Sequence, residues 1–82
     1  MMPEDSMLRS VLAAVQEVAP AAAVNEDTQL IATRTIDSLS LLSLVSLLES
    51  EFSVTIRDSE ILPAHFDTPL AIRAFLKSKG CR

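Results

Sequence analysis

The stretch Asp37–Phe52, with the sequence DSLSLLSLVSLLESEF, decides the fold of this chain. Apolar residues recur in it at spacings of three and four, and at about 100° per residue they form one stripe along a helix. Asp37 and Ser38 are both good N-capping residues. The pattern therefore predicts an amphipathic helix that starts at Asp37 and Ser38 and ends before Ser53. Its core stripe is Leu41, Leu44, Val45, Leu48 and Phe52.

Two more helices are predicted, one on each side of this stretch. Residues 7–19 carry apolar side chains three and four apart until Pro20 ends the pattern. Towards the C-terminus, Thr68 can cap a last helix, Pro69 suits its first position and Gly80 can terminate it.

The segments that join these helices are less regular. Residues 20–36 have no clean period and contain the turn formers Asn25 and Asp27, so they are expected to form a long loop of a kind that is often functional. Residues 54–56 suit an extended connector, and residues 58–63 support at most a turn or one brief helix. We predict an all-α fold, a small bundle of three main helices plus one short helix around a single core.

Size and charge narrow the classes of function. With 82 residues, of which 49% are hydrophobic, the chain can bury one core, so residues 1–82 are expected to form a single domain. It has neither an apolar run that could span a membrane nor a start typical of a signal peptide, which predicts a cytoplasmic protein without a membrane partner. The net charge is −4, and residues 37–67 hold six acids but only one lysine or arginine, Arg57, which argues against binding to nucleic acid.

Few residues in the chain suit catalysis. The only histidine, His65, is interpreted as a surface or half-buried turn residue, and the only cysteine, Cys81, as an exposed thiol without a neighbouring base. The only glycine, Gly80, leaves no glycine-rich phosphate loop. We therefore predict no catalytic residue and no metal site. A small enzyme that uses Cys81 or His65 is a weaker alternative.

Several short motifs follow one another in a defined order. They are the long loop with Thr28 and Leu30, the tetrapeptide Ile36-Asp37-Ser38-Leu39, the helix end Leu47–Phe52, the extended Val54-Thr55-Ile56, the acidic Asp58 and Glu60, and Phe66-Asp67-Thr68. From about Met7 to Leu76 the chain thereby resembles the acyl and peptidyl carrier protein family, and it looks most like free-standing members. The resemblance implies an acyl-carrier-protein-like fold. It also implies a non-catalytic carrier of acyl or aminoacyl thioesters in fatty-acid-like, polyketide or nonribosomal peptide biosynthesis.

The resemblance implies particular site residues and partners. Ser38 would carry a covalent 4′-phosphopantetheine arm that comes from coenzyme A, and Asp37 would help to orient the transferase and its divalent metal. The dipole and the free N–H groups at the start of the helix are expected to favour the phosphate. The implied partners are a phosphopantetheinyl transferase, a loading enzyme (an adenylating ligase or an acyltransferase) and a downstream synthase or transferase.

The chain departs from the commonest pattern of that family at three positions. Thr35 stands where many members have glycine, so the resemblance does not predict the backbone geometry at this point of the loop. Ser40 and Ser43 stand where fatty acid carriers often have acids. A partner with a more apolar or neutral site is therefore expected.

The side of the second helix opposite its core stripe is the expected partner-binding surface. It comprises Leu39, Leu42, Ser43 and Ser46, with Ser50 further along. In the alternative interpretation the two leucines pack under the long loop. A second hypothesis for function is a helical adaptor domain that binds a partner protein through this helix, with Ser38 serving only as a cap.

Overall fold

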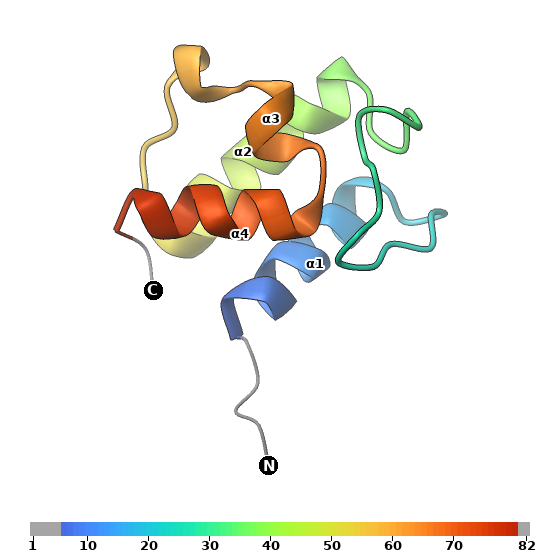
Figure 1. The fold of residues 1–82 in the computed structure, drawn as a ribbon, viewed down its shortest axis with the longest axis horizontal. Helices are drawn as coiled ribbons and strands as arrows, with labels where there is room; N and C mark the ends of the chain where they lie inside the picture. Colours follow the sequence, from blue (N-terminus) through green and yellow to red (C-terminus); the bar gives the residue numbers. More distant parts are fainter. Residues whose placement is uncertain (1–5, 81–82) are drawn as a thin grey trace.

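The computed structural model describes residues 6–80, and in this range the chain is all-helical without a strand. The three main helices are α1 (Ser6–Val18), α2 (Ser38–Phe52) and α4 (Pro69–Ser78). Between α2 and α4 lie two short elements, the 3-10 helix η1 (Asp58–Glu60) and the helix α3 (Pro63–Phe66). The predicted all-α bundle of three main helices is confirmed (Figure 1).

The predicted short helix is α3, and the separate 3-10 helix η1 precedes it. Proline has no N–H and fits only the first turn of a helix, so Pro63 begins α3 and cannot lie in the middle of a continuous helix. The 3-10 helix therefore stops at Glu60, and Ile61 and Leu62 link it to α3 in a non-helical backbone.

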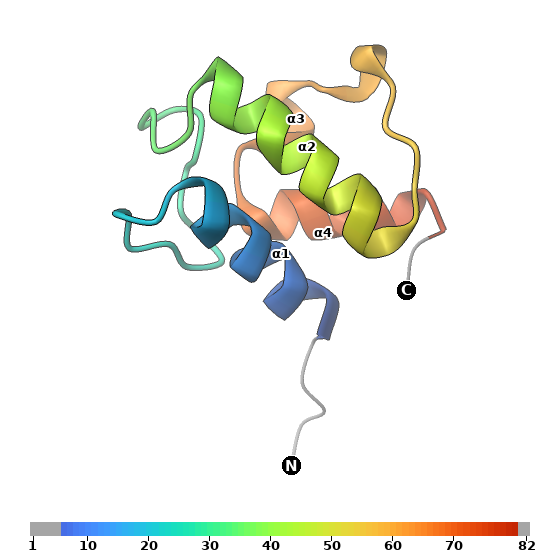
Figure 2. The ribbon, with the colours of Figure 1, turned by 180° about the vertical axis from the view of Figure 1, so that it is seen from behind.

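Helix α1 connects the other two main helices of the bundle. Figure 2 shows α1 and α2 side by side, with the end of α1 near the start of α2 and with α4 crossing behind them. Helix α1 contacts both α2 and α4, and α3 packs on α4. This arrangement brings the first turn of α2 and the long loop to the same end of the molecule (Figure 2).

The core is formed by the apolar stripes of these helices. Of the stripe predicted on α2, Leu44, Val45 and Leu48 are buried, whereas Leu41 and Phe52 are half-buried at its edges. Side chains from α1, the long loop, the connector after α2, α3 and α4 complete the core, and each of these residues is at least nine-tenths shielded from solvent. They are Met7, Val11, Val15, Ala19, Leu30, Ile36, Ile56, Phe66, Ile72, Phe75 and Leu76.

The long loop is fixed to the bundle at several points. Leu30 and Ile36 are buried, and the N–H of Ile36 donates to the carbonyl of Leu30 at 3.2 Å, which closes a turn between them. The N–H of Leu30 donates to the carbonyl of Asp67, and the N–H of Leu70 donates to the carbonyl of Glu26. The loop therefore presents a defined surface next to the start of α2.

The connector after α2 is fastened at both of its ends. A carboxylate oxygen of Glu49 accepts the N–H of Ile56 at 2.8 Å. Glu60 accepts two hydrogen bonds from Lys79 at 2.8 and 2.9 Å, and the N–H of Arg57 together with Lys79 holds the pKa of Glu60 below its ordinary value. These contacts tie the connector to the end of α4.

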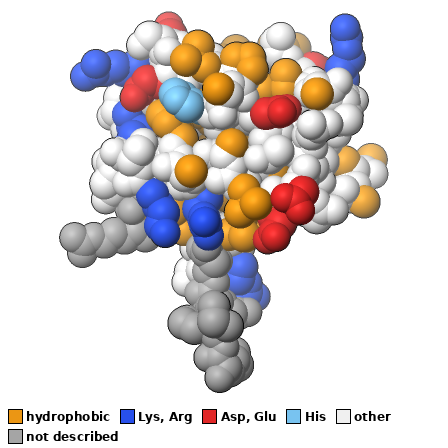
Figure 3. Space-filling model, in the orientation of Figure 1, with side chains coloured by type: hydrophobic (Ala, Val, Ile, Leu, Met, Phe, Trp, Pro, Cys, Tyr) orange, Lys and Arg blue, Asp and Glu red, His pale blue; other side chains and the backbone are white. Residues whose placement is uncertain are grey.

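On the α4 side of the molecule, basic, acidic and apolar side chains are mixed (Figure 3). Between residues 6 and 80, no helix is both long and apolar enough to cross a membrane.

Candidate functional site

Asp37 and Ser38 lie where the long loop passes into α2. Asp37 is the N-cap residue in an extended conformation, and its Oδ1 accepts the N–H of Ser40 at 2.8 Å. The pKa of Asp37 lies below its ordinary value mainly because the backbone N–H of Ser40 donates to its carboxylate, with a smaller contribution from the side chain of Ser40. The carboxylate is therefore ionised at neutral pH.

Ser38 is the first residue of α2, and its side chain does not cap the helix. The residue is exposed, and within residues 6–80 no hydrogen bond involves its hydroxyl. Asp37 performs the capping that the sequence allowed either residue to perform. The hydroxyl of Ser38 is consequently available to an external reactant.

The turn that precedes Asp37 has an unusual backbone. Arg34 adopts a φ of 58°, in the left-handed region, whereas Thr35 has a negative φ. The N–H of Arg34 donates to the carbonyl of Ile31 at 3.1 Å, and the hydroxyls of Thr33 and Thr35 are 2.8 Å apart. The residue that needs glycine-like freedom is thus Arg34, one position before the Thr35 that the sequence had singled out.

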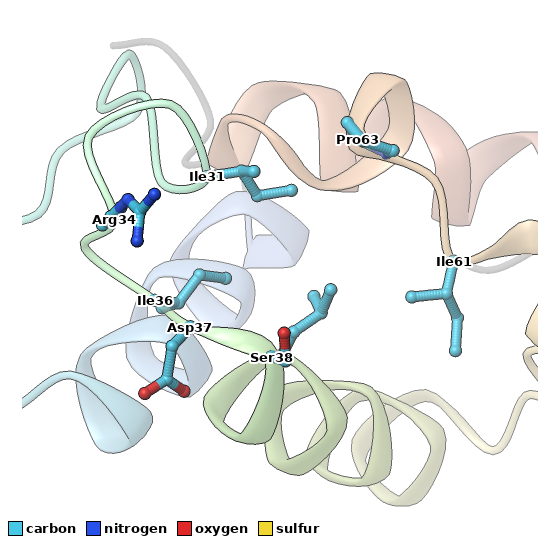
Figure 4. Close-up of a pocket in the computed structure, with 8 residues that line it drawn as sticks. Ile31, Arg34, Ile36, Asp37, Ser38, Ile61 and Pro63 are labelled. Atoms are coloured by element: carbon cyan, nitrogen blue, oxygen red, sulfur yellow. The ribbon is translucent and has the colours of Figure 1, made fainter.

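A pocket of about 460 Å³ opens beside Ser38. Three segments build it: the loop before α2, the first turn of α2, and the link from η1 to α3. Figure 4 shows Ile31 and Ile61 pointing into the space from opposite sides, the guanidinium of Arg34 near the loop, and the carboxylate of Asp37 directed away. The lining residues are Ile31, Arg34, Ile36, Asp37, Ser38, Leu41, Ile61 and Pro63.

The expected partner surface is exposed on α2. The exposed fraction is 76% for Leu39 and 56% for Leu42, so neither leucine packs under the loop. Ser43 and Ser46 are also exposed. A groove of about 600 Å³ runs between the end of α1 and α2, and Leu39, Ser43 and Ser46 line it together with Glu17, Val18, Ser40 and Leu47. Leu42 is not among its lining residues.

The two residues considered for catalysis lie elsewhere. His65 belongs to α3, where it is half-buried, with Nδ1 2.9 Å from the carbonyl oxygen of Glu60 and its ring stacked on Phe75 at a centroid distance of 4.5 Å. It does not line the pocket beside Ser38. Cys81 lies outside the described residues.

Sequence reasoning did not identify Arg34, Ile31, Ile61 or Pro63 as parts of this site. A signal existed for Arg34, because it is the only lysine or arginine between Arg9 and Arg57 and it stands four residues before Ser38. The other three come from segments whose meeting depends on the tertiary fold.

One comparison with known proteins identifies the family. A family model described as the phosphopantetheine attachment site matches residues 8–76, which extends from α1 to α4 and includes the exposed Ser38. No curated protein and no solved structure gives a significant match. Because the family match covers most of the chain, the chain belongs to the phosphopantetheine attachment site family, whose carrier domains covalently carry a 4′-phosphopantetheine group.

Proposed function

We propose that this chain carries acyl or aminoacyl intermediates as thioesters on a 4′-phosphopantetheine arm attached to Ser38. The observation that carries the proposal is the hydroxyl of Ser38, which is exposed and free of hydrogen bonds within the described residues, inside the region that matches the family. When bound, the arm supplies a terminal thiol that holds the cargo as a thioester.

The residues around Ser38 fit such a group. The exposed hydroxyl leaves room for a phosphodiester, and the pocket beside it is lined mainly by apolar side chains with one cation, Arg34. A serine hydroxyl is a weak nucleophile without a base, and none of the residues lining the pocket is a histidine. Loading therefore requires a separate phosphopantetheinyl transferase with coenzyme A and magnesium, and the ionised Asp37 is suited to orient that metal.

The exposed face of α2 is the surface that we propose for partners. From Ser38 to Leu48 the helix has no charged residue, and Leu39, Leu42, Ser43 and Ser46 are exposed along it. Such a face suits an enzyme site that is apolar or neutral, because a basic site would find no acid to pair with. The partners proposed are the transferase, an adenylating ligase or acyltransferase that loads the cargo, and a downstream synthase or transferase.

Two further proposals follow from the same interpretation. We propose that residues 1–82 act as one carrier domain, which the single core supports. We also propose that the chemistry belongs to the partner enzymes and not to this chain. The cytoplasmic location stays a prediction from the sequence.

A helical adaptor is the second candidate function, and the exposure of Leu39 favours it. A leucine that is 76% exposed can anchor a partner protein whether or not Ser38 is modified. The two candidates differ in the requirement for an arm: an adaptor binds its partner equally well before and after incubation with a transferase.

Peptide mapping tests the proposed attachment site. The chain is incubated with a promiscuous phosphopantetheinyl transferase, coenzyme A and magnesium, and is then digested with trypsin. Cleavage after Arg34 and Arg57 releases residues 35–57, which contain Ser38. Fragmentation of this peptide should place the arm on Ser38. An arm on another serine, or no arm at all, contradicts the proposal.

A further inference from the structure

Arg34 is placed where a negative charge on Ser38 would need a partner. It is the only lysine or arginine between Arg9 and Arg57, and it lines the same pocket as Ser38. Figure 4 shows its guanidinium on the pocket side of the chain that leads into α2. No ion pair or side-chain hydrogen bond occupies Arg34 within the described residues.

The backbone of Arg34 is held in a conformation that a side chain disfavours. A φ of 58° brings Cβ close to the following carbonyl oxygen, so residues with a side chain seldom adopt it unless the surroundings impose it. Here the surroundings do so: the N–H of Arg34 is bonded to Ile31, and the turn is closed between the buried Leu30 and Ile36. The arginine side chain therefore starts from a fixed point beside Ser38.

The start of α2 is less available to a phosphate than the sequence suggested. The carboxylate of Asp37 already accepts the N–H of Ser40 at 2.8 Å, so one of the free N–H groups in the first turn is occupied. A phosphodiester on Ser38 would also stand beside the negative charge of Asp37. Like charges at neighbouring positions repel, so the added group gains most from a cation nearby. Among the residues that line the pocket, Arg34 is that cation.

We propose that the guanidinium of Arg34 donates hydrogen bonds to the phosphodiester of the loaded chain and holds the base of the arm at the pocket bounded by Ile31 and Ile61. This rests on the proposed attachment to Ser38. Guanidinium groups present several donors in one plane and bind phosphate oxygens through charge-assisted hydrogen bonds. The contact directs the arm's base away from the groove that Leu39 lines, which leaves the partner surface of α2 uncovered.

Phosphorus NMR on the isolated loaded chain tests this role without any partner enzyme. Wild type, Arg34→Gln and the control Lys77→Gln are each loaded, and the phosphodiester resonance is followed from about 0.01 M to 1 M salt, across which the Debye length falls from about 30 Å to about 3 Å. In wild type and Lys77→Gln the resonance should move with salt. In Arg34→Gln it should start near the high-salt position and stay there. Arg34→Lys, which keeps the charge, should restore part of the movement.

Thermal unfolding gives a second readout. Loading should raise the melting temperature of wild type by about 2–4 °C more than that of Arg34→Gln, because an exposed charge-assisted contact in a chain of this size has an effect of that order. If wild type and Arg34→Gln gain equally in melting temperature on loading and their phosphodiester resonances depend equally on salt, the inference is overturned. A variant that is loaded slowly, but is indistinguishable from wild type once loaded, also overturns it and assigns Arg34 to contact with the transferase. Intact mass after incubation with the transferase distinguishes the two proposals. If wild type gains no arm, the proposed function and this inference both fail. If wild type gains the arm, but its phosphodiester resonance and melting temperature do not depend on Arg34, only this inference fails.

Discussion

Leu42→Asp and Leu48→Asp place the same charge on an exposed and a buried position of α2, and the structure predicts very different results. Leu48 is completely buried, whereas 56% of Leu42 is exposed. Losing the packing of a buried leucine costs about 2–5 kcal/mol, and an unpaired buried carboxylate adds several more. A chain of 82 residues has about 4–12 kcal/mol of stability in total. Leu48→Asp should therefore unfold most of the protein.

Leu42→Asp should leave the fold in place. Complete burial of a leucine is worth about 1.5–3 kcal/mol, and less than half of Leu42 is shielded, so the lost burial is about 1 kcal/mol. The lower helix propensity of aspartate adds about 0.5 kcal/mol. The melting temperature should fall by about 5–10 °C, which leaves a folded chain at 25 °C.

The same substitution should impair partner reactions. A carboxylate at position 42 must lose water when an apolar enzyme site closes over α2, and a loss of even 1.4 kcal/mol slows the reaction about tenfold. Circular dichroism melts and single-turnover rates of loading by the transferase are compared for both variants and for the control Ala74→Asp, an exposed position on α4 outside the proposed partner surface. Melting of Leu42→Asp as low as that of Leu48→Asp, or wild-type rates in a folded Leu42→Asp chain, would refute the assigned partner surface.

Two other substitutions follow from the capping residues of α2. Ser53 ends the helix with a φ of 52°, a conformation that glycine adopts without the steric cost of a side chain. Ser53→Gly should therefore stabilise the chain by about 0.5 kcal/mol, measured by urea unfolding. A loss of stability would show that this φ costs nothing. The pKa of Asp37 is lowered in the folded chain because Ser40 donates hydrogen bonds to its carboxylate. The contribution of this group to stability is therefore present above its pKa in the unfolded chain, near about 4, and is lost as the pH falls through its lower pKa in the folded chain. Asp37→Asn should keep the cap at neutral pH but show a flatter loss of stability between about pH 5 and pH 2, and an unchanged acid profile would contradict the assignment.

The sequence predicted the parts of the fold that depend on local periodicity. The stripe on α2 is readable because three- and four-residue spacings map directly onto one face of a helix, and Leu44, Val45 and Leu48 are buried as expected. The caps were readable for the same local reason. The sequence did not show which of Asp37 and Ser38 is the N-cap residue. Both residue types cap helices well, and only the backbone conformation distinguishes them.

The site itself was only half predictable. The serine and its acidic neighbour are adjacent in the chain, whereas the walls of the pocket come from residues such as Ile31 and Ile61 that lie in separate loops. Their meeting depends on how the long loop closes over Leu30, a tertiary contact without a sequence period. The strained φ of Arg34 was hidden as well, because arginine gives no local signal for a left-handed conformation.

The attachment of an arm to Ser38 is the central claim, and intact mass spectrometry tests it most directly. Wild type, Ser38→Ala and the control Ser59→Ala, an exposed serine in η1, are incubated with a promiscuous transferase, coenzyme A and magnesium. Because the hydroxyl of Ser38 caps nothing, Ser38→Ala should melt within a few degrees of wild type, so a failure to load would report lost chemistry. Wild type and Ser59→Ala should each gain one phosphopantetheine and Ser38→Ala none, whereas a gain of the arm by a folded Ser38→Ala chain would contradict the account.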